Sequence, residues 1–300
     1  MQEIPIFDST NLSEITQNIE IFIKNALKRL KKDGAIIGLS GGLDSAVTAT
    51  LLVRSLGLSK VKLLNMPEKD SKSIHQRHAK QLANHLGIKL MKRRINGPLR
   101  VSGTYRLLPL RFIPTQKLRA LLIKVGKKRF LSDGDAHLLL DRFSYRPRSW
   151  MARANAYAMT KHRMRMTFIY KYADFLNYAV VGAANRTEWL TGTFSKWGID
   201  HCADIMPIIH VYRSQLDPLA KYLQIPDYIR FKGADPDIIP GDLNKGDLLG
   251  GFSLVDQILF NLENGLPKEK LFEKFDKSRV EIIDQLWKNS QCMREIPYHL

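Results

Sequence analysis

Apolar residues occur along this chain in two kinds of pattern, short continuous runs and stripes at helical spacing. Runs at residues 35–39, 61–66 and 178–185 predict buried strands, because a strand covered on both faces has no need of polar positions. Stripes that recur every three or four residues predict helices at 15–30, 46–56 and 73–85. This alternation of strands and helices predicts an α/β fold with a doubly wound parallel sheet.

The pattern is interrupted between residues 92 and 155. Prolines at 98, 109, 114 and 147 alternate there with arginine and aromatic residues, and a connection of this length is uncommon inside a compact domain. We therefore expect a single domain over residues 1–300 that carries a basic insertion or lid at about 92–155. The other predicted elements are a short strand at 88–91 and helices at 116–125, 136–143, 163–177, 212–223, 252–261 and 268–287.

Composition narrows the class of protein. A chain of 300 residues with 44% hydrophobic residues can bury one substantial core. It has no long uncharged apolar run and no basic region followed by an apolar one at its start, so we expect neither a membrane span nor a signal peptide and predict a cytoplasmic protein. Cys202 and Cys292 have no partner pattern, which indicates two reduced thiols rather than a disulfide scaffold or a zinc cluster.

The net charge of +18 is concentrated in one segment. Residues 89–171 contain 21 Lys and Arg against three acids, so this segment accounts for the whole excess. Such a segment suits an anionic partner, for which a nucleotide with several phosphates and RNA are both candidates. A solvated basic surface without a ligand is the third interpretation.

The stretch Ser40-Gly41-Gly42-Leu43-Asp44-Ser45 joins the first predicted strand to the helix that follows it. Paired glycines allow a ligand to approach the backbone, and the free N–H groups at the start of a helix attract anions. The two serines add hydroxyl donors. A carboxylate beside a phosphate is repulsive unless a cation lies between them, so Asp44 implies Mg²⁺. The alternative is a tight turn in which the glycines have only a structural role.

A second acid follows the strand predicted at 178–185. If the sheet is parallel, Glu188 lies near the same edge as Asp44, and the two carboxylates could share one metal ion. Taken alone, Glu188 is better explained as an exposed glutamate at the start of a helix. A polar loop with a lysine, aromatic residues and two acids follows at residues 193–204.

Several blocks in this order resemble the ammonia-dependent NAD synthetases, whose phosphate loop is that of the N-type ATP pyrophosphatases. The resemblance covers about residues 15–90 and 160–262. The family pattern Gly-Thr-Gly-Asn is Gly-Ala-Ala-Asn here, at residues 182–185. The matching blocks are residues 40–45, Arg163-Met164-Arg165-Met166, residues 181–188, Phe194-Ser195-Lys196-Trp197-Gly198 with Asp204, and residues 211–226.

The resemblance implies a Rossmann-like sheet of the adenine nucleotide α-hydrolase kind, and a homodimer. It implies that the carboxylate of nicotinic acid adenine dinucleotide attacks the α-phosphate of ATP and that ammonia then displaces AMP. A separate glutaminase partner is an open alternative source of ammonia. By position, the resemblance assigns ATP binding to Ser40, Gly41, Gly42, Ser45 and Arg213, substrate binding to Arg163, Arg165 and Asp200, the metal to Asp44 and Glu188, and catalysis to Asp44, Lys196 and Asp204.

Two other functions remain open at this point. The same adenylation and amidation could act on a different anionic carboxylate. The basic segment also fits an ATP pyrophosphatase that modifies RNA, although cysteine pairs for sulfur transfer and aromatic stacking motifs are lacking, which argues against a nucleic-acid partner.

Overall fold

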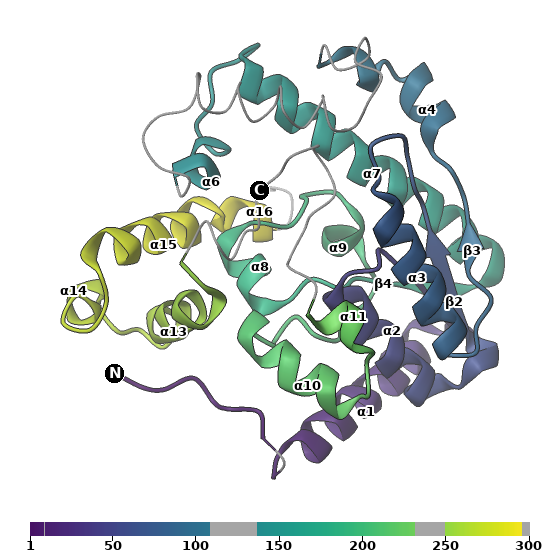
Figure 1. The fold of residues 1–300 in the computed structure, drawn as a ribbon, viewed down its shortest axis with the longest axis horizontal. Coiled ribbons are helices and arrows are strands. Elements are labelled where there is room, and N and C mark those ends of the chain that lie inside the picture. The colour runs from purple at the N-terminus through teal and green to yellow at the C-terminus, as the bar shows by residue number, and fades with distance from the viewer. Residues whose placement is uncertain (9, 109–136, 232–249, 296–300) are drawn as a thin grey trace.

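The computed structural model describes residues 1–8, 10–108, 137–231 and 250–295. Its centre is a four-stranded sheet in the order β3-β2-β1-β4, in which every pair of neighbours is parallel (Figure 1). The predicted parallel α/β fold is therefore confirmed. The strands are β1 (Gly34–Gly38), β2 (Val61–Asn65), β3 (Met91–Lys92) and β4 (Tyr178–Val181).

Alternate residues of the strands face two separate apolar cores. Ala35 and Ile37 of β1 enter one core, whereas Ile36 enters the other, as the two-residue period of a strand requires. The first core is closed by α1 (Leu12–Leu30), α2 (Leu43–Leu56), α3 (Ser73–His85), α10 (Leu216–Tyr222) and α11 (Asp227–Arg230). The second is closed mainly by α7 (Trp150–Leu176), with α4 (Asn96–Val101), η2 (Thr104–Arg106) and α9 (Ile199–Cys202). Helices thus cover both faces, as in a doubly wound sheet.

A third apolar core lies beside the sheet and is built mainly from helices. Its C-terminal helices are α13 (Phe252–Glu263), α14 (Lys268–Leu271), α15 (Lys277–Asn289) and α16 (Gln291–Arg294), which pack with α6 (His137–Asp141) and α8 (Arg186–Thr191) (Figure 1). The short helices η1 (Leu58–Lys60) and η4 (Arg213–Gln215) complete the described elements.

The first residues of the chain run along this helical layer. The backbone N–H of Gln2 donates to Asn261 Oδ1 at 2.9 Å, and that of Ile4 donates to Gln257 Oε1 at 3.1 Å. Gln215 Nε2 in turn donates to the carbonyl of Pro5 at 2.7 Å. The N-terminal segment therefore joins α13 to η4, which directly precedes α10.

Several sequence predictions of elements need correction. The helix expected at 163–177 begins at Trp150 instead, where Ser149 caps it by accepting from the N–H of Ala152. The helix expected at 268–287 is two helices, because Asp276 caps α15 by accepting from the N–H of Arg279. The strand expected at 178–185 ends at Val181. The expected helix at 116–125 and residues 109–136 of the expected basic insertion lie outside the described residues. Within the described part of the chain, no helix is long and apolar enough to cross a membrane.

Candidate active site

Residues 40–45 form the turn between β1 and α2 together with the first residues of α2, and we call them the phosphate loop after the family motif that they resemble. Hydrogen bonds of the Ser40 and Ser45 hydroxyl groups hold this turn in shape. Ser40 Oγ lies 2.9 Å from Ser45 Oγ, and it accepts from the N–H of Gly42 at 3.2 Å. Ser45 Oγ in turn donates to the carbonyl of Gly42 at 3.1 Å. Gly42 is the N-cap of α2 and provides no side-chain cap, so backbone N–H groups of the first turn remain available at this end. Hydroxyl groups and N–H groups at the start of a helix are the kinds of donor that bind anions in proteins.

Gly41 must be glycine for two reasons. Its φ is +81°, and a Cβ placed on it would lie 2.3 Å from the carbonyl oxygen of His75 on α3. The loop therefore packs directly against the first turn of α3.

We expect Gly41→Ala to lower stability and nucleotide affinity. Positive φ costs an alanine about 1–2 kcal/mol, and the clash with α3 adds about 1–3 kcal/mol. Gly103→Ala is the control, because Gly103 has a φ of +73° in the left-handed region but no atom within 4 Å of the added Cβ. Thermal denaturation should show a larger loss for Gly41→Ala, and equal losses would contradict the close contact.

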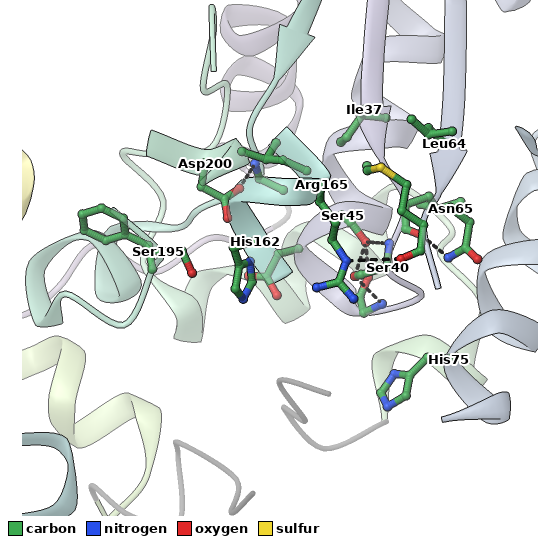
Figure 2. Close-up of a pocket in the computed structure, with 18 of the residues that line it drawn as sticks. Ile37, Ser40, Ser45, Leu64, Asn65, His75, His162, Arg165, Ser195 and Asp200 are labelled. Carbon is green, nitrogen blue, oxygen red and sulfur yellow. Dashed lines mark hydrogen bonds between the residues drawn. The ribbon is translucent and has the colours of Figure 1, made fainter. Parts of the chain in front are cut away.

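A cavity of about 280 Å³ lies at the carboxyl edge of the sheet and is lined in part by this loop (Figure 2). Its floor is formed by the ends of β1, β2 and β4 and by the phosphate loop, and its walls come from α3, α7, α8 and the loop before α9. Ligands of open α/β sheets bind at this edge. Of the residues singled out in the sequence, those in the lining are Ser40, Gly42, Asp44, Ser45, Arg165, Glu188, Asp200 and Arg213.

Two acids face this cavity from different elements. Asp44 Oδ1 accepts from Asn185 Nδ2 at 2.6 Å, and Asn185 Oδ1 caps α8 by accepting from the N–H of Glu188 at 2.9 Å. Asn185 thus links the start of α2 to the start of α8. The parallel pairing of β1 with β4 brings the two acids to one edge, as the sequence suggested.

Arg213 is held in place by a buried acid of the C-terminal layer. The N–H of Arg213 donates to Thr187 Oγ1 at 2.9 Å, and the Thr187 hydroxyl donates to Asp256 Oδ1. Asp256 Oδ2 accepts from the N–H of Ser214 at 2.7 Å. Burial raises the pKa of the fully buried Asp256 carboxyl, although these hydrogen bonds and the charge of Arg213 oppose the rise. Asp256 therefore fixes the residues next to both Glu188 and Arg213.

The remaining predicted residues divide between the cavity and its surroundings. Arg165 lines the cavity and its Nε donates to the carbonyl of Met66 at 3.2 Å. Asp200 also lines it, and its Oδ1 accepts from the N–H of Ala183 at 2.9 Å. Arg163, two residues before Arg165, lies outside the lining, and its Nη2 donates to the carbonyl of Lys196 at 3.4 Å.

Asp204 and Lys196 lie outside the lining as well, contrary to the positions expected for them. Asp204 Oδ2 accepts from the N–H of Val180 at 2.7 Å, so it supports the start of β4. Lys196 Nζ donates to the carbonyl of Cys292, next to the ring of Trp197. Both side chains are thus used in structural contacts in this conformation.

Sequence reasoning did not single out several residues of the lining. Asn65, at the end of β2, donates from Nδ2 to the carbonyl of Leu39 at 2.8 Å, which turns its Oδ1 away from that bond. That buried oxygen accepts no hydrogen bond from the described part of the chain. A polar residue ending an apolar strand at the ligand edge is the signal that could have found it. His75, His162 and Thr193 also line the cavity, without any spacing that marks them in sequence.

The fold and the glycine-containing loop define a class: α/β proteins that bind nucleotides at the carboxyl edge of a parallel sheet. Comparison with known families is more specific. The sequence model described as NAD synthase matches residues 15–108 and 139–297. The chain belongs to the NAD synthase family.

Individual relatives agree with this assignment. The chain is 35% identical over 295 residues to the NH3-dependent NAD synthetase of Thermotoga neapolitana, covering 96% of this chain and 97% of the relative. It is 36% identical over 282 residues to that of Thermotoga maritima, covering 92% and 95%.

Solved structures support the fold alone, because their sequence identities are low. An NMN synthetase from Francisella tularensis aligns with a TM-score of 0.67 at 23% identity, covering 96% of this chain and 98% of the other. An NH3-dependent NAD synthetase from Campylobacter jejuni aligns with a TM-score of 0.66 at 22% identity, covering 96% and 99%.

Proposed function

We propose that the cavity at the carboxyl edge of the sheet amidates nicotinic acid adenine dinucleotide with ammonia at the expense of ATP. The protein is a ligase of the ammonia-dependent NAD synthetase type. The observation that carries this conclusion is the identity of 35% or more to ammonia-dependent enzymes over nearly the whole of both chains. The phosphate loop that lines the cavity supplies the expected ATP site.

In the first step, the loop binds the leaving pyrophosphate. We assign the β and γ phosphates of ATP to the hydroxyls of Ser40 and Ser45 and to the N–H groups at the start of α2. The substrate carboxylate attacks the α-phosphate, the bond between the α and β phosphates breaks, and an acyl adenylate and pyrophosphate result. Arg213, which lines the cavity from η4, neutralises phosphate charge as the pyrophosphate forms.

The donor set of the cavity fits Mg²⁺. This ion commonly binds one or two protein carboxylates together with phosphate oxygens and water, and Asp44 and Glu188 line the cavity beside the phosphate loop. Among the described residues, no group of three or more His, Cys, Asp or Glu side chains could hold a metal ion, so these residues by themselves form no closed metal cage. We assign the metal to Asp44 and Glu188. When bound, Mg²⁺ neutralises the phosphate oxygens that gain charge in the first step.

In the second step, ammonia attacks the acyl carbon, the bond from that carbon to AMP breaks, and the nitrogen loses one proton to solvent as the amide forms. Arg165 is the cavity residue best placed to bind a phosphate of the substrate, since its guanidinium reaches the lining from α7. Asp200 lines the cavity, so we keep its assignment as a substrate-binding residue. The side chains of Arg163, Lys196 and Asp204 must leave the contacts described above before they can take the roles expected of them. Homodimer assembly and a glutaminase partner stay predictions.

The direct test is an activity assay with defined products. Incubation with ATP, Mg²⁺, an ammonium salt and nicotinic acid adenine dinucleotide should yield equal amounts of NAD, AMP and pyrophosphate. Nicotinic acid mononucleotide is the control acceptor. AMP formation with that or another acid, but not with the dinucleotide, would overturn the substrate assignment.

A further inference from the structure

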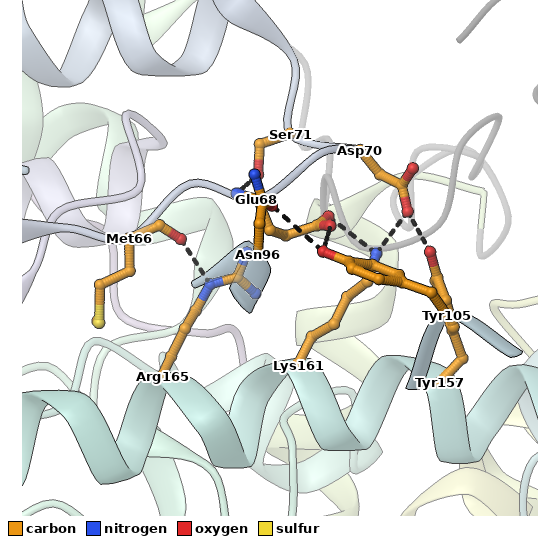
Figure 3. Close-up of polar contacts among 9 residues, drawn as sticks. All are labelled: Met66, Glu68, Asp70, Ser71, Asn96, Tyr105, Tyr157, Lys161 and Arg165. Carbon is orange, nitrogen blue, oxygen red and sulfur yellow. Dashed lines mark hydrogen bonds and ion pairs between the residues drawn. The ribbon is translucent and has the colours of Figure 1, made fainter. Parts of the chain in front are cut away.

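A group of charged side chains lies buried behind one wall of the cavity (Figure 3). Lys161 of α7 has no exposed side-chain surface, and its Nζ lies 2.9 Å from Glu68 Oε1 and 2.8 Å from Asp70 Oδ2. The two acids are buried as completely, with 0% and 1% of their side chains exposed. We call Lys161, Glu68 and Asp70 the charged triad.

Two tyrosines complete the surroundings of the triad. Tyr105 donates its hydroxyl to Glu68 Oε2 at 3.0 Å, and Tyr157 donates to Asp70 Oδ2. Burial by itself would raise the pKa of Asp70, but the charge and hydrogen bond of Lys161, aided by Tyr157, hold this pKa below its ordinary value. Asp70 is therefore ionised at neutral pH, and it forms an ion pair with Lys161.

Buried ion clusters seldom add stability when compared with apolar side chains of the same shape, because desolvating the charges offsets their attraction. Their directional hydrogen bonds do fix the relative position of the segments that carry them. The basic segment of the sequence thus contains a lysine that faces neither solvent nor an external anion.

The triad joins two segments that also meet at the cavity. Glu68 and Asp70 lie between β2 and α3, within residues 66–71, and Met66, Pro67 and Ser71 of the same stretch line the cavity. Lys161 lies 93 residues beyond Glu68 in the chain.

Arg165 follows Lys161 by one helical turn on α7, so both side chains lie on the same face of the helix. Arg165 Nε donates to the carbonyl of Met66, two residues before Glu68. The triad and the Arg165–Met66 contact therefore connect the same two segments at adjacent points, one inside the protein and one at the cavity (Figure 3).

We propose that the charged triad positions Arg165 for binding a nucleotide phosphate. Lys161 holds residues 66–71 against α7. This fixes the position of the Met66 carbonyl, which in turn orients the guanidinium of Arg165. Lys161 does not line the cavity, so it is a positioning residue and does not touch substrate. The inference rests on the role proposed above for Arg165.

A variant without the three charges, the neutral triad, tests whether the triad positions Arg165 or only stabilises the fold. The triple variant Lys161→Met, Glu68→Gln, Asp70→Asn removes all three charges at nearly constant volume, so no unpaired charge is left buried. We expect it to fold with a Tm within a few degrees of the wild type. Tyr157→Phe, which removes one hydroxyl from Asp70, is the milder variant if the triple variant does not fold.

The measurement is equilibrium binding of two nucleotides, an ATP analogue with a methylene group between the α and β phosphates and nicotinic acid adenine dinucleotide. We expect Arg165→Met to weaken at least one of them by about tenfold, as for the loss of one charged contact. The neutral triad should weaken the same nucleotide by at least about fivefold, with a smaller loss in Tyr157→Phe. When the neutral triad is combined with Arg165→Met, binding should be less than about twofold weaker than in Arg165→Met alone.

The matched control is Lys288→Met, which breaks an ion pair with Asp284 on α15 and leaves the cavity lining intact. Its affinities should equal those of the wild type. The inference is overturned if the folded neutral triad, or Tyr157→Phe in its place, binds both nucleotides with wild-type affinity. The inference is also overturned if the loss of affinity in the combined variant equals the product of the losses in the two separate variants. Wild-type affinity in Arg165→Met would overturn it as well. A wild-type protein that binds nucleotide but forms no NAD would refute the proposed function and leave this binding test intact.

Discussion

Replacing Asp44 by asparagine is expected to lower the rate of AMP formation by at least about a thousandfold. The variant keeps a side-chain oxygen for the amide of Asn185 but loses the negative charge proposed to hold Mg²⁺. A metal ion that neutralises developing phosphate charge lowers the barrier by several kcal/mol, and about 1.4 kcal/mol corresponds to a factor of ten. The measurement is AMP release at saturating substrates over a range of Mg²⁺ concentrations.

The control for this prediction is a measurement of Tm, which shows whether the variant is still folded. Asp44 lies at the start of α2, and its replacement should change Tm little, since the cavity side of this residue is open to the ligand. Asp217→Asn changes an acid that pairs with Arg230 away from the cavity lining, and should leave AMP release unaltered. Wild-type turnover and an unchanged Mg²⁺ requirement in Asp44→Asn would remove Asp44 from the metal site.

Asp256→Ala is expected to cause the largest loss of stability among single substitutions around the site. Asp256 is fully buried and accepts from Thr187 and from the backbone of Ser214, so its removal leaves two donors without their acceptor. We expect a loss of about 2–5 kcal/mol. Chemical denaturation measures it. Turnover at a temperature where the variant is folded should also fall, because Thr187 and Ser214 adjoin Glu188 and Arg213.

The isosteric variant Asp256→Asn tests how the titration of the Asp256 carboxyl contributes to stability. Burial raises the pKa of Asp256, so the folded chain holds this proton more tightly than the unfolded chain does. The stability contributed by protonation is complete below the ordinary pKa of 3.8 and is lost as the pH rises through the raised value. The Tm of the wild type relative to Asp256→Asn should therefore decline from acid to neutral pH. A difference independent of pH would show that the carboxyl does not titrate in this way.

The phosphate loop and its flanking elements were predictable because local signals agree there. The predicted strand at 35–39 and helix at 46–56 lie within a few residues of β1 and α2, and the glycines mark the turn between them. Residues 73–85 form a helix as predicted, since its apolar stripe faces a single core. Local periodicity and local turn chemistry were sufficient in these places.

The start of α7 was not predictable in the same way. Its buried face in the first turns consists of Ala154, Tyr157, Ala158 and Lys161, which includes a lysine and no aliphatic residue larger than alanine. A buried lysine interrupts the apolar stripe by which a helix is detected. Its partners, Glu68 and Asp70, are more than 90 residues away in the chain. Only tertiary structure brings them together.

The candidate site shows the same division. Motif residues such as Ser40, Asp44 and Glu188 reach the cavity because strand ends of a parallel sheet share one edge. The sequence places Asp204 and Lys196 equally close to the site, yet the structure uses their side chains to hold the start of β4 and α16. Position along the chain determines which residues are near a site, whereas side-chain direction depends on neighbours that sequence does not reveal.

The hydrogen bonds of the N-terminal segment constrain the order in which this chain folds. Gln2 and Ile4 take their partners from α13, 259 and 253 residues later in the chain. During synthesis on a ribosome, these bonds cannot form until α13 has emerged, by which time every strand of the sheet has been made. The contact between the N-terminal segment and α13 therefore forms only after the sheet has been synthesised, and it is a contact of very high sequence separation.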